Sequence, residues 1–120
     1  LGDVYKRQVI MHNDNILTEA GASNLFFIKD GDICTPELSN NILPGITRQI
    51  LIDTLASINI KVYEKDFTLD DLKAASSAWL TSSTKGIAPI IDIINLETNL
   101  ILNDDMYLIV KKNFDANYFS

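Results

Sequence analysis

The chain has 120 residues, of which 47% are hydrophobic and 22% charged, and this length is enough for one domain with a modest core. Its net charge of −6 and the absence of any basic run longer than Lys111-Lys112 argue against nucleic acid or an anionic membrane surface as partner. No apolar run is long enough to span a bilayer, and the single cysteine, Cys34, has neither a disulfide partner nor neighbouring metal ligands. We therefore predict a cytoplasmic protein without a metal site.

The first residues of the chain differ from the rest. Residues 1–8 are polar, mixed in charge and without periodicity, and the chain starts with Leu1. They resemble tails found in translations of environmental sequence reads. We expect residues 1–8 to be a non-native tail and the folded domain to comprise residues 9–120.

The first half of the chain is predicted to be mostly strand. A short apolar run at 9–12 ends in a turn cluster, and a segment rich in small residues follows at 18–24. Residues 25–29 read as a strand. Asp30-Gly31 then forms a hairpin turn into a second strand at 32–35.

A helix is predicted from about Ile46 to Ile58, directly after Pro44-Gly45. Apolar residues recur from there at helical spacing, at Ile46, Ile50, Leu51, Leu55 and Ile58. Gly45 lets the backbone approach a ligand closely, and the first N–H groups of the helix point at that space. Such a helix end suits an anion, and a phosphate best.

The second half of the chain alternates between strands and helices. Thr68 is predicted to cap a short helix that runs through Ala75, with two aspartates in its first turn. Further strands are predicted at residues 61–65, 78–81, 88–94 and 100–102, and a last helix at 105–117. This mixture indicates an α/β or α+β class.

Three polar stretches lie at the ends of these elements. They are Glu19 with the small residues after it, the helix start at Ile46-Thr47, and the hydroxyl-rich run at 82–84. Each also has a purely structural interpretation: a surface glutamate by a turn, a capped helix with Leu43 in the core, and a solvated loop. No stretch decides between the interpretations alone.

Taken in chain order, these stretches resemble the C-terminal half of the class IV aminotransferases, the fold-type IV pyridoxal-phosphate enzymes. The matching text is Glu-Ala-Gly-Ala-Ser-Asn-Leu-Phe at 19–26, Thr-Pro at 35–36, Ile-Leu-Pro-Gly-Ile-Thr-Arg at 42–48, and Leu-Thr-Ser-Ser-Thr at 80–84 with Pro89. The resemblance implies the C-terminal, cofactor-binding domain of this fold, a mixed sheet or pseudo-barrel with flanking helices. The family's N-terminal domain would be missing.

The resemblance also implies a pyridoxal 5′-phosphate site. Its residues would be Glu19, Leu43, Ile46, Thr47, Ser83 and Thr84. Glu19 would keep the pyridine nitrogen protonated, so that the ring accepts electrons from the substrate, and Leu43 would pack on the ring. The amides of Ile46 and Thr47, with the Thr47 hydroxyl and Ser83, would hold the phosphate, and Thr84 would lie beside them.

Other residues receive supporting or structural interpretations. Ser23 and Asn24 would brace the Glu19 loop. Arg48 has no clear chemical role, and we expect it on the helix surface or in a salt bridge. Cys34 is expected to be a small buried residue and Trp79 part of the core.

Details of the motifs favour one subfamily. Ala-Ser-Asn-Leu-Phe and Leu-Thr-Ser-Ser-Thr resemble the D-amino-acid (D-alanine) aminotransferases most, ahead of the branched-chain aminotransferases and the aminodeoxychorismate lyases. The substrates would be a D-amino acid and a 2-oxo acid, and whole members of the family are typically homodimers.

The family's Schiff-base lysine is expected upstream, by more than the 18 residues that precede Glu19. No residue of this chain is therefore assigned a catalytic role, and the chain alone is expected to be inactive. The competing hypothesis is a non-catalytic remnant of the fold that binds a phosphate ligand or a partner.

Overall fold

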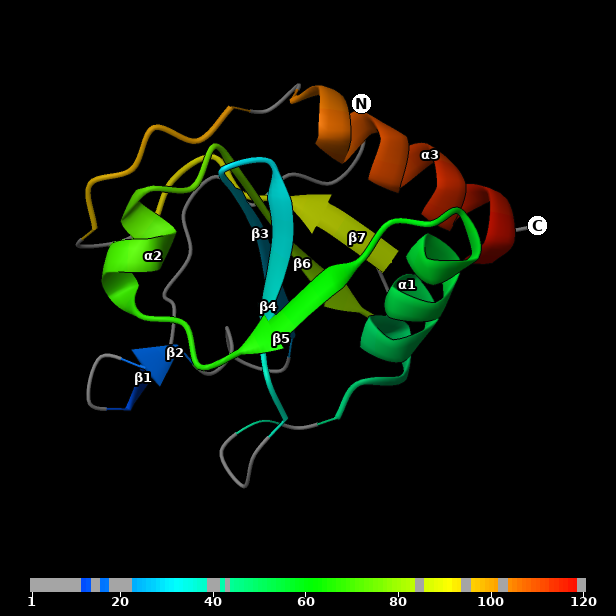
Figure 1. The fold of residues 1–120 in the computed structure, drawn as a ribbon, viewed down its shortest axis with the longest axis horizontal. Helices are drawn as coiled ribbons and strands as arrows, with labels where there is room; N and C mark the ends of the chain where they lie inside the picture. Colours follow the sequence, from blue (N-terminus) through cyan, green and yellow to red (C-terminus); the bar gives the residue numbers. More distant parts are fainter. Residues whose placement is uncertain are drawn as a thin grey trace.

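A five-stranded mixed sheet forms the centre of the computed structural model, which describes residues 12–13, 16–17, 23–38, 42, 44–83, 86–93, 96–101 and 104–118 (Figure 1). Its strands are β3 (Asn24–Lys29), β4 (Asp32–Pro36), β5 (Val62–Lys65), β6 (Ser77–Ser82) and β7 (Gly86–Pro89), in the order β5-β4-β3-β6-β7. Only β4 and β5 run parallel. A separate antiparallel pair consists of β1 (His12–Asn13) and β2 (Ile16–Leu17).

The hairpin between β3 and β4 is confirmed, with its turn at Asp30-Gly31. Both turn residues adopt positive φ angles, 53° at Asp30 and 81° at Gly31. Two such angles in a row give the turn a twist that matches the two strands, and Asp-Gly is among the sequences that tolerate them best. The turn sets the register in which Ile28 faces Ile33.

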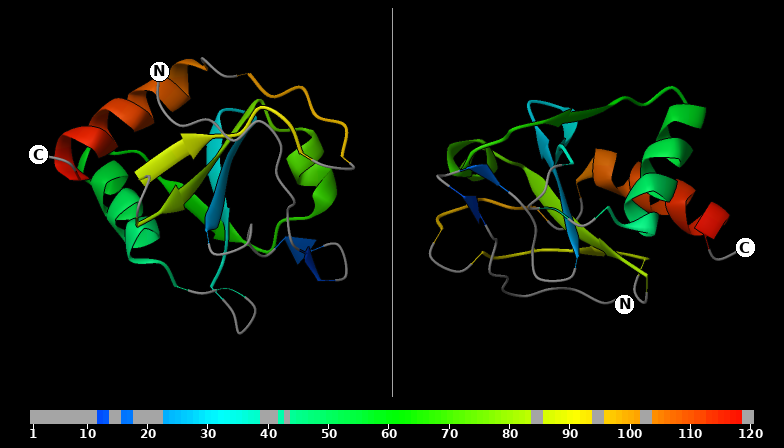
Figure 2. Two further views of the ribbon diagram at one scale, coloured as in Figure 1. Left: turned by 180° about the vertical axis from the view of Figure 1, so that it is seen from behind. Right: turned by 90° about the horizontal axis from the view of Figure 1, so that it is seen from below.

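The three helices found among the described residues cover the two faces of the sheet. Helix α1 (Ile46–Ser57) and helix α3 (Asp105–Tyr118) lie side by side on one face, and the short helix α2 (Leu69–Lys73) lies on the other (Figures 1 and 2). The expected α/β (α+β) class, a mixed sheet with flanking helices, is confirmed. No helix in the described ranges has both the length and the apolar sequence needed to cross a membrane.

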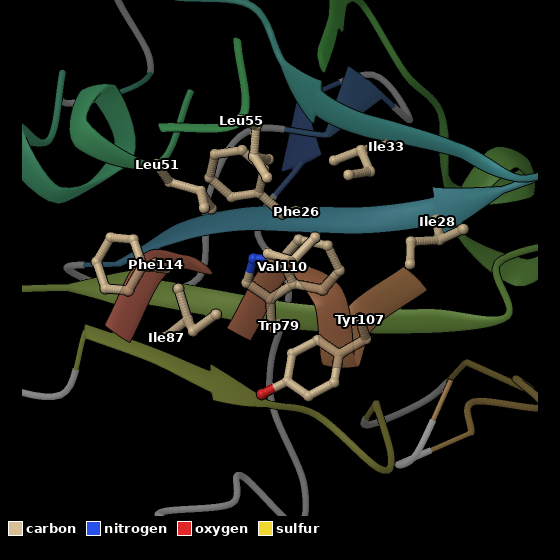
Figure 3. Packing of buried hydrophobic residues seen from close by; sticks show 10 residues of the cluster. All are labelled: Phe26, Ile28, Ile33, Leu51, Leu55, Trp79, Ile87, Tyr107, Val110 and Phe114. Atoms are coloured by element: carbon tan, nitrogen blue, oxygen red, sulfur yellow. The ribbon is translucent and has the colours of Figure 1, made fainter. Parts of the chain in front are cut away.

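The larger part of the core lies between the sheet and helices α1 and α3. Phe26 and Trp79 come from neighbouring strands and stack, with ring centroids 5.9 Å apart and planes 4° from parallel (Figure 3). Both are fully buried, so the prediction that Trp79 belongs to the core is confirmed. The other buried members of this cluster are Ile28, Ile33, Leu51, Leu55, Ile87, Tyr107, Val110 and Phe114.

A second cluster fills the opposite face of the sheet, beneath α2. Strand residues Leu25, Phe27 and Leu80 pack there against Leu72 of the helix. Cys34 belongs to this cluster and is 4% exposed, as expected. Burial, with a smaller effect from the negative charge of Asp32, raises the pKa of its thiol to about 11.

The cap predicted for α2 is present. The Thr68 hydroxyl accepts a hydrogen bond from the Asp71 amide, and the Asp71 carboxylate accepts one from the Thr68 amide. This reciprocal arrangement is a capping box. Helix α3 also begins as predicted, because Asp104 accepts hydrogen bonds from the amides of Met106 and Tyr107.

Two predicted strands differ in the structure. The strand expected at 88–94 is β7, which begins earlier, at Gly86, and ends at Pro89. Pro89 faces Trp79, the Ile90 amide still donates a hydrogen bond to the Ala78 carbonyl, and β6 has only Ser77 beyond that point. Residues 100 and 101 of the strand expected at 100–102 belong to no strand, although the Ile101 amide donates a hydrogen bond to the Ser76 carbonyl. Residue 102 lies outside the described ranges.

Candidate functional site

The described parts of the three polar stretches meet at one end of the five-stranded sheet. Asn24 opens β3 and faces Thr81, near the end of the neighbouring strand β6. Gly45, directly before α1, lies so close to Asn24 that a methyl group added at Gly45 would clash with the Asn24 Oδ1 atom. The start of β3, the end of β6 and the N-terminus of α1 are therefore neighbours.

Helix α1 begins without a side-chain cap. Gly45 is its N-cap residue, with an ordinary extended backbone, and as a glycine it has no side chain that could accept a hydrogen bond from the first turn. The first four N–H groups of an α-helix have no acceptor within the helix. Helix α2 fills this need with its capping box, whereas the N-cap residue of α1 supplies no such cap, and a helix end of this kind favours an anion.

The two residues predicted to offer these amides differ in exposure. The Ile46 side chain is 78% exposed, whereas Thr47 is only 4% exposed. The backbone amides of both residues lie in the first turn of α1, regardless of how exposed their side chains are. The proposed contribution of Ile46 thus rests on its backbone, and Thr47 combines a backbone amide with a buried hydroxyl.

Strand β6 brings a second feature to this end of the sheet. Thr81 is 1% exposed, and its hydroxyl has no hydrogen-bond partner among the described residues. A buried polar group without a partner is costly in a folded protein, which makes the Thr81 hydroxyl a candidate for contact with a ligand. Thr81 was part of the matched motif but received no role. Strand alternation with Trp79, which packs under α1 and α3, would have placed it on the α1 side of the sheet.

Ser83 follows β6 and is exposed. Its carbonyl accepts a hydrogen bond from the Tyr118 hydroxyl at 3.1 Å, which links the end of α3 to this loop. Ser83 therefore lies just beyond the end of β6, two residues after Thr81.

Arg48 corrects one expectation. Its side chain lies inside the protein, with the residue 1% exposed, so a place on the helix surface is wrong. The expected salt bridge is confirmed, because its Nη2 atom lies 2.7 Å from the Glu64 carboxylate and 3.2 Å from the Pro36 carbonyl oxygen. The first turn of α1 faces the ends of β4 and β5, so an arginine there turns inward.

Some predicted features lie outside the described residues. They are the tail at residues 1–8 and three of the cofactor-binding residues, Glu19, Leu43 and Thr84. The bracing of the Glu19 loop by Ser23 and Asn24 depends on one of them and stays a prediction. Of the predicted cofactor residues, the structure places Ile46, Thr47 and Ser83.

These described residues suit a phosphate group. An uncapped helix end, a glycine at its cap position and a buried hydroxyl without a partner supply N–H and O–H donors in one place. Phosphate oxygens are strong acceptors for such donors. The geometry is therefore compatible with the phosphate of a cofactor.

Comparison with known proteins points to one family. The family model described as amino-transferase class IV matches residues 4–93. The chain is 44% identical over 86 residues to a D-alanine aminotransferase of Listeria monocytogenes, and the match covers 72% of this chain and 30% of that protein. It is 33% identical over 96 residues to branched-chain-amino-acid aminotransferase 5 of Arabidopsis thaliana, covering 80% and 23%. The chain thus spans less than a third of the length of these relatives.

Solved structures agree with this fold. A Legionella pneumophila protein provisionally assigned as a 4-amino-4-deoxychorismate lyase superposes with a TM-score of 0.82 at 27% identity, over 91% of this chain and 40% of that one. An aminotransferase from Brucella abortus, bound to its cofactor PLP, superposes with a TM-score of 0.72 at 26% identity, over 88% and 35%.

Proposed function

We propose that this chain, which belongs to the class IV aminotransferase family, is the cofactor-binding part of a pyridoxal-phosphate-dependent transaminase. The transaminase would move an amino group from a D-amino acid of the D-alanine type to a 2-oxo acid. The observation that carries the proposal is the uncapped N-terminus of α1, which lies against Asn24 at the end of the sheet where Thr81 has a buried hydroxyl without a partner.

The chain's own residues would bind and orient the cofactor. The amides of Ile46 and Thr47, with the Thr47 hydroxyl and Ser83, would hold its phosphate, and Thr84 would lie beside them. Leu43 would pack on the face of the ring. Glu19 would hold a proton at the pyridine nitrogen, and with that proton in place the bound cofactor supplies an electron sink for the carbanion formed on the substrate.

Catalysis would also need a lysine that we propose lies outside this chain. In the family a lysine forms the covalent link to the cofactor and moves the proton. We propose that in the whole protein this lysine lies upstream of the domain at 9–120, and that residues 1–8 are not part of the native sequence that carries it. The chain alone would then bind cofactor and be inactive. The alternative is a non-catalytic remnant that binds a phosphate ligand.

The substrate class rests on similarity. The identity of 44% to a D-alanine aminotransferase, against 33% to a branched-chain enzyme, supports a D-amino acid. A branched-chain amino acid aminotransferase and an aminodeoxychorismate lyase remain the alternatives. For the whole protein we propose a cytoplasmic homodimer.

Cofactor binding by the chain is tested with pyridoxamine 5′-phosphate and pyridoxamine. The amine form of the cofactor needs no lysine to bind, and the two compounds differ only in the phosphate. Fluorescence titration of the chain should give a dissociation constant at least about tenfold lower for the phosphorylated compound, since charge-assisted hydrogen bonds contribute about 1.5 to 3 kcal/mol. Equal dissociation constants would refute the phosphate site.

A matched control separates this effect from general stability. Thr47→Ala should weaken binding of the phosphorylated compound only. Thr68→Ala removes the threonine that caps α2, and the loss of this cap should lower the free energy of unfolding by about 1 kcal/mol. It should leave both dissociation constants unchanged.

The substrate is tested with the whole protein. We expect amino transfer from D-alanine to 2-oxoglutarate, little transfer from L-leucine, and loss of transfer in Glu19→Ala. Preference for L-leucine would support the branched-chain alternative. No transfer from either amino acid by a whole protein that contains the upstream lysine would contradict the assignment to transaminases.

A further inference from the structure

Arg48 is the largest charged side chain in the buried interior of the described chain. Arginine is almost never fully buried unless it is paired, and here the residue is 1% exposed. Its Nη2 atom donates to the Glu64 carboxylate and to the Pro36 carbonyl oxygen, while its Nε atom has no partner among the described residues. Burying an incompletely paired guanidinium costs stability, so the position of Arg48 calls for a physical explanation.

Its contacts tie the first turn of α1 to two strands. Arg48 is the third residue of α1 and directly follows Thr47. Pro36 ends β4, and Glu64 lies in the parallel neighbour β5, opposite Thr35. One guanidinium group therefore joins the start of the helix to the same end of both strands.

The same turn is fixed on a second side. Gly45 rests against Asn24 at the start of β3, as the clash of an added methyl group there indicates. With Arg48 held by β4 and β5, the helix start is anchored to three adjacent strands. The direction of the Ile46 and Thr47 amides then depends on both anchors.

The charge of Arg48 also has the wrong sign for its place in the helix. The N-terminus of a helix carries partial positive charge, so a cation in the first turn is unfavourable. Glu64 compensates part of this charge, but its side chain is 42% exposed to solvent. The contacts with Pro36 and Glu64, and not the charge, therefore account for the place of Arg48 in this turn.

We propose that Arg48 is a positioning residue for the phosphate: its bonds to Pro36 and Glu64 hold the first turn of α1 so that the amides of Ile46 and Thr47 point at the phosphate oxygens. This inference rests on the proposed function, because it presumes that the helix end binds the cofactor. Arg48 itself acts through the helix and touches neither the reacting atoms nor the substrate.

The readout is phosphate selectivity, the dissociation constant of pyridoxamine divided by that of pyridoxamine 5′-phosphate. Arg48→Met keeps a long side chain but removes the guanidinium. It should lower the selectivity of the full chain by about tenfold, which corresponds to the loss of one charge-assisted hydrogen bond between a helix amide and the phosphate. The affinity for pyridoxamine should stay within about twofold of wild type. Arg48→Lys keeps the charge and a single donor nitrogen in place of the guanidinium fork, and should restore part of the selectivity. A purely structural role would weaken both ligands equally and leave the selectivity unchanged, which would overturn the proposal.

Glu64→Ala distinguishes positioning from simple charge. Glu64 is partly exposed, and Arg48 keeps the Pro36 carbonyl as an acceptor when Glu64 is replaced, so this variant gives a second test beside Arg48→Met. If Arg48 acts only through its charge, removal of the Glu64 carboxylate makes the site more positive and raises selectivity, which would overturn the proposal. If Arg48 positions the helix, loss of its acceptor lowers selectivity.

A matched variant and the wild type complete the test. Lys29→Met breaks another ion pair, the 2.6 Å contact between Lys29 and Asp71 at α2, and should leave selectivity unchanged. A wild-type selectivity near one would refute the proposed function. A high wild-type selectivity that Arg48→Met and Glu64→Ala do not change would refute only the role of Arg48.

Discussion

The Oδ1 atom of Asn24 lies so close to Gly45 that it leaves no room for the Cβ atom of any other residue there. Asn24 opens β3, and Gly45 precedes α1. The backbone of Gly45 is in an ordinary extended conformation that any residue adopts, so the glycine is needed for space and not for its dihedral angles. This contact sets how closely the amide end of α1 approaches the sheet.

Gly45→Ala should therefore displace the start of α1. We expect a lower melting temperature and loss of the preference for pyridoxamine 5′-phosphate over pyridoxamine, measured by thermal unfolding and fluorescence titration. Gly31→Ala is the matched control. A methyl group at Gly31 meets no atom, but φ is +81°, so this variant should lose about 1 to 2 kcal/mol of stability through backbone strain and keep the phosphate preference. An unchanged preference in Gly45→Ala would contradict the assigned site.

The stacked pair Phe26 and Trp79 should dominate the stability of the domain. Phe26→Ala removes a fully buried ring and should lower the free energy of unfolding by about 3 to 5 kcal/mol, measured by urea denaturation. Leu108→Ala on α3 removes a side chain that is 47% exposed and should change it by less than about 0.5 kcal/mol. Equal losses in the two variants would mean that this core is not formed as described.

Cys34 should be unreactive in the folded protein. Burial and the nearby Asp32 raise the pKa of its thiol to about 11, so the thiolate that reacts with thiol reagents is scarce at neutral pH. A disulfide reagent at pH 8 should modify Cys34 only as fast as the domain unfolds, and immediately in urea. Rapid modification under native conditions would show that the sheet face under α2 is open.

Stability should fall in acid through Asp71. The hydrogen bond from Lys29, supported by the Thr68 amide, lowers the pKa of the Asp71 carboxyl below its ordinary value of 3.8. The unfolded chain therefore takes up this proton at higher pH than the folded chain does. The contribution is complete above that ordinary value and is lost as pH falls through the folded pKa.

The measurement is the free energy of unfolding in urea between pH 6 and pH 2. At alkaline pH the same hydrogen bond raises the pKa of Lys29, so the stability that Lys29 contributes should be lost only as pH rises beyond the ordinary value of 10.5.

Asp71→Asn should flatten the acid part of the curve, because asparagine has no proton to gain but still offers an oxygen to the Thr68 amide. Identical acid limbs in wild type and Asp71→Asn would exclude this pair as a cause.

Local signals predicted the elements that form from local interactions. The apolar spacing after Gly45 gave the extent of α1 to within one residue, and Asp30-Gly31 placed the hairpin correctly. Thr68 was identified as a cap because the capping box spans only four residues. In each case the residues that determine the structure lie within a few positions of one another.

Features that depend on distant residues were missed. The extent of β7 follows from where β6 begins, which periodicity within β7 does not reveal. Arg48 is buried because Pro36 and Glu64, 12 and 16 positions away in the chain, meet at its guanidinium. The unpartnered hydroxyl of Thr81 likewise becomes apparent only when its neighbours in space are known.

The most direct test of the account is to locate the phosphate on the chain. In amide NMR spectra of the ¹⁵N-labelled chain, pyridoxamine 5′-phosphate should shift the resonances of Ile46 and Thr47 most strongly, and pyridoxamine should not. The cleft of about 550 Å³ beside α2 serves as a comparison, because its lining has one lysine, Lys73, but also the carboxylates of Asp92 and Glu97, which disfavour an anion. Shifts confined to that cleft, or none at α1 with saturating ligand, would contradict the assignment of the α1 N-terminus as the phosphate site.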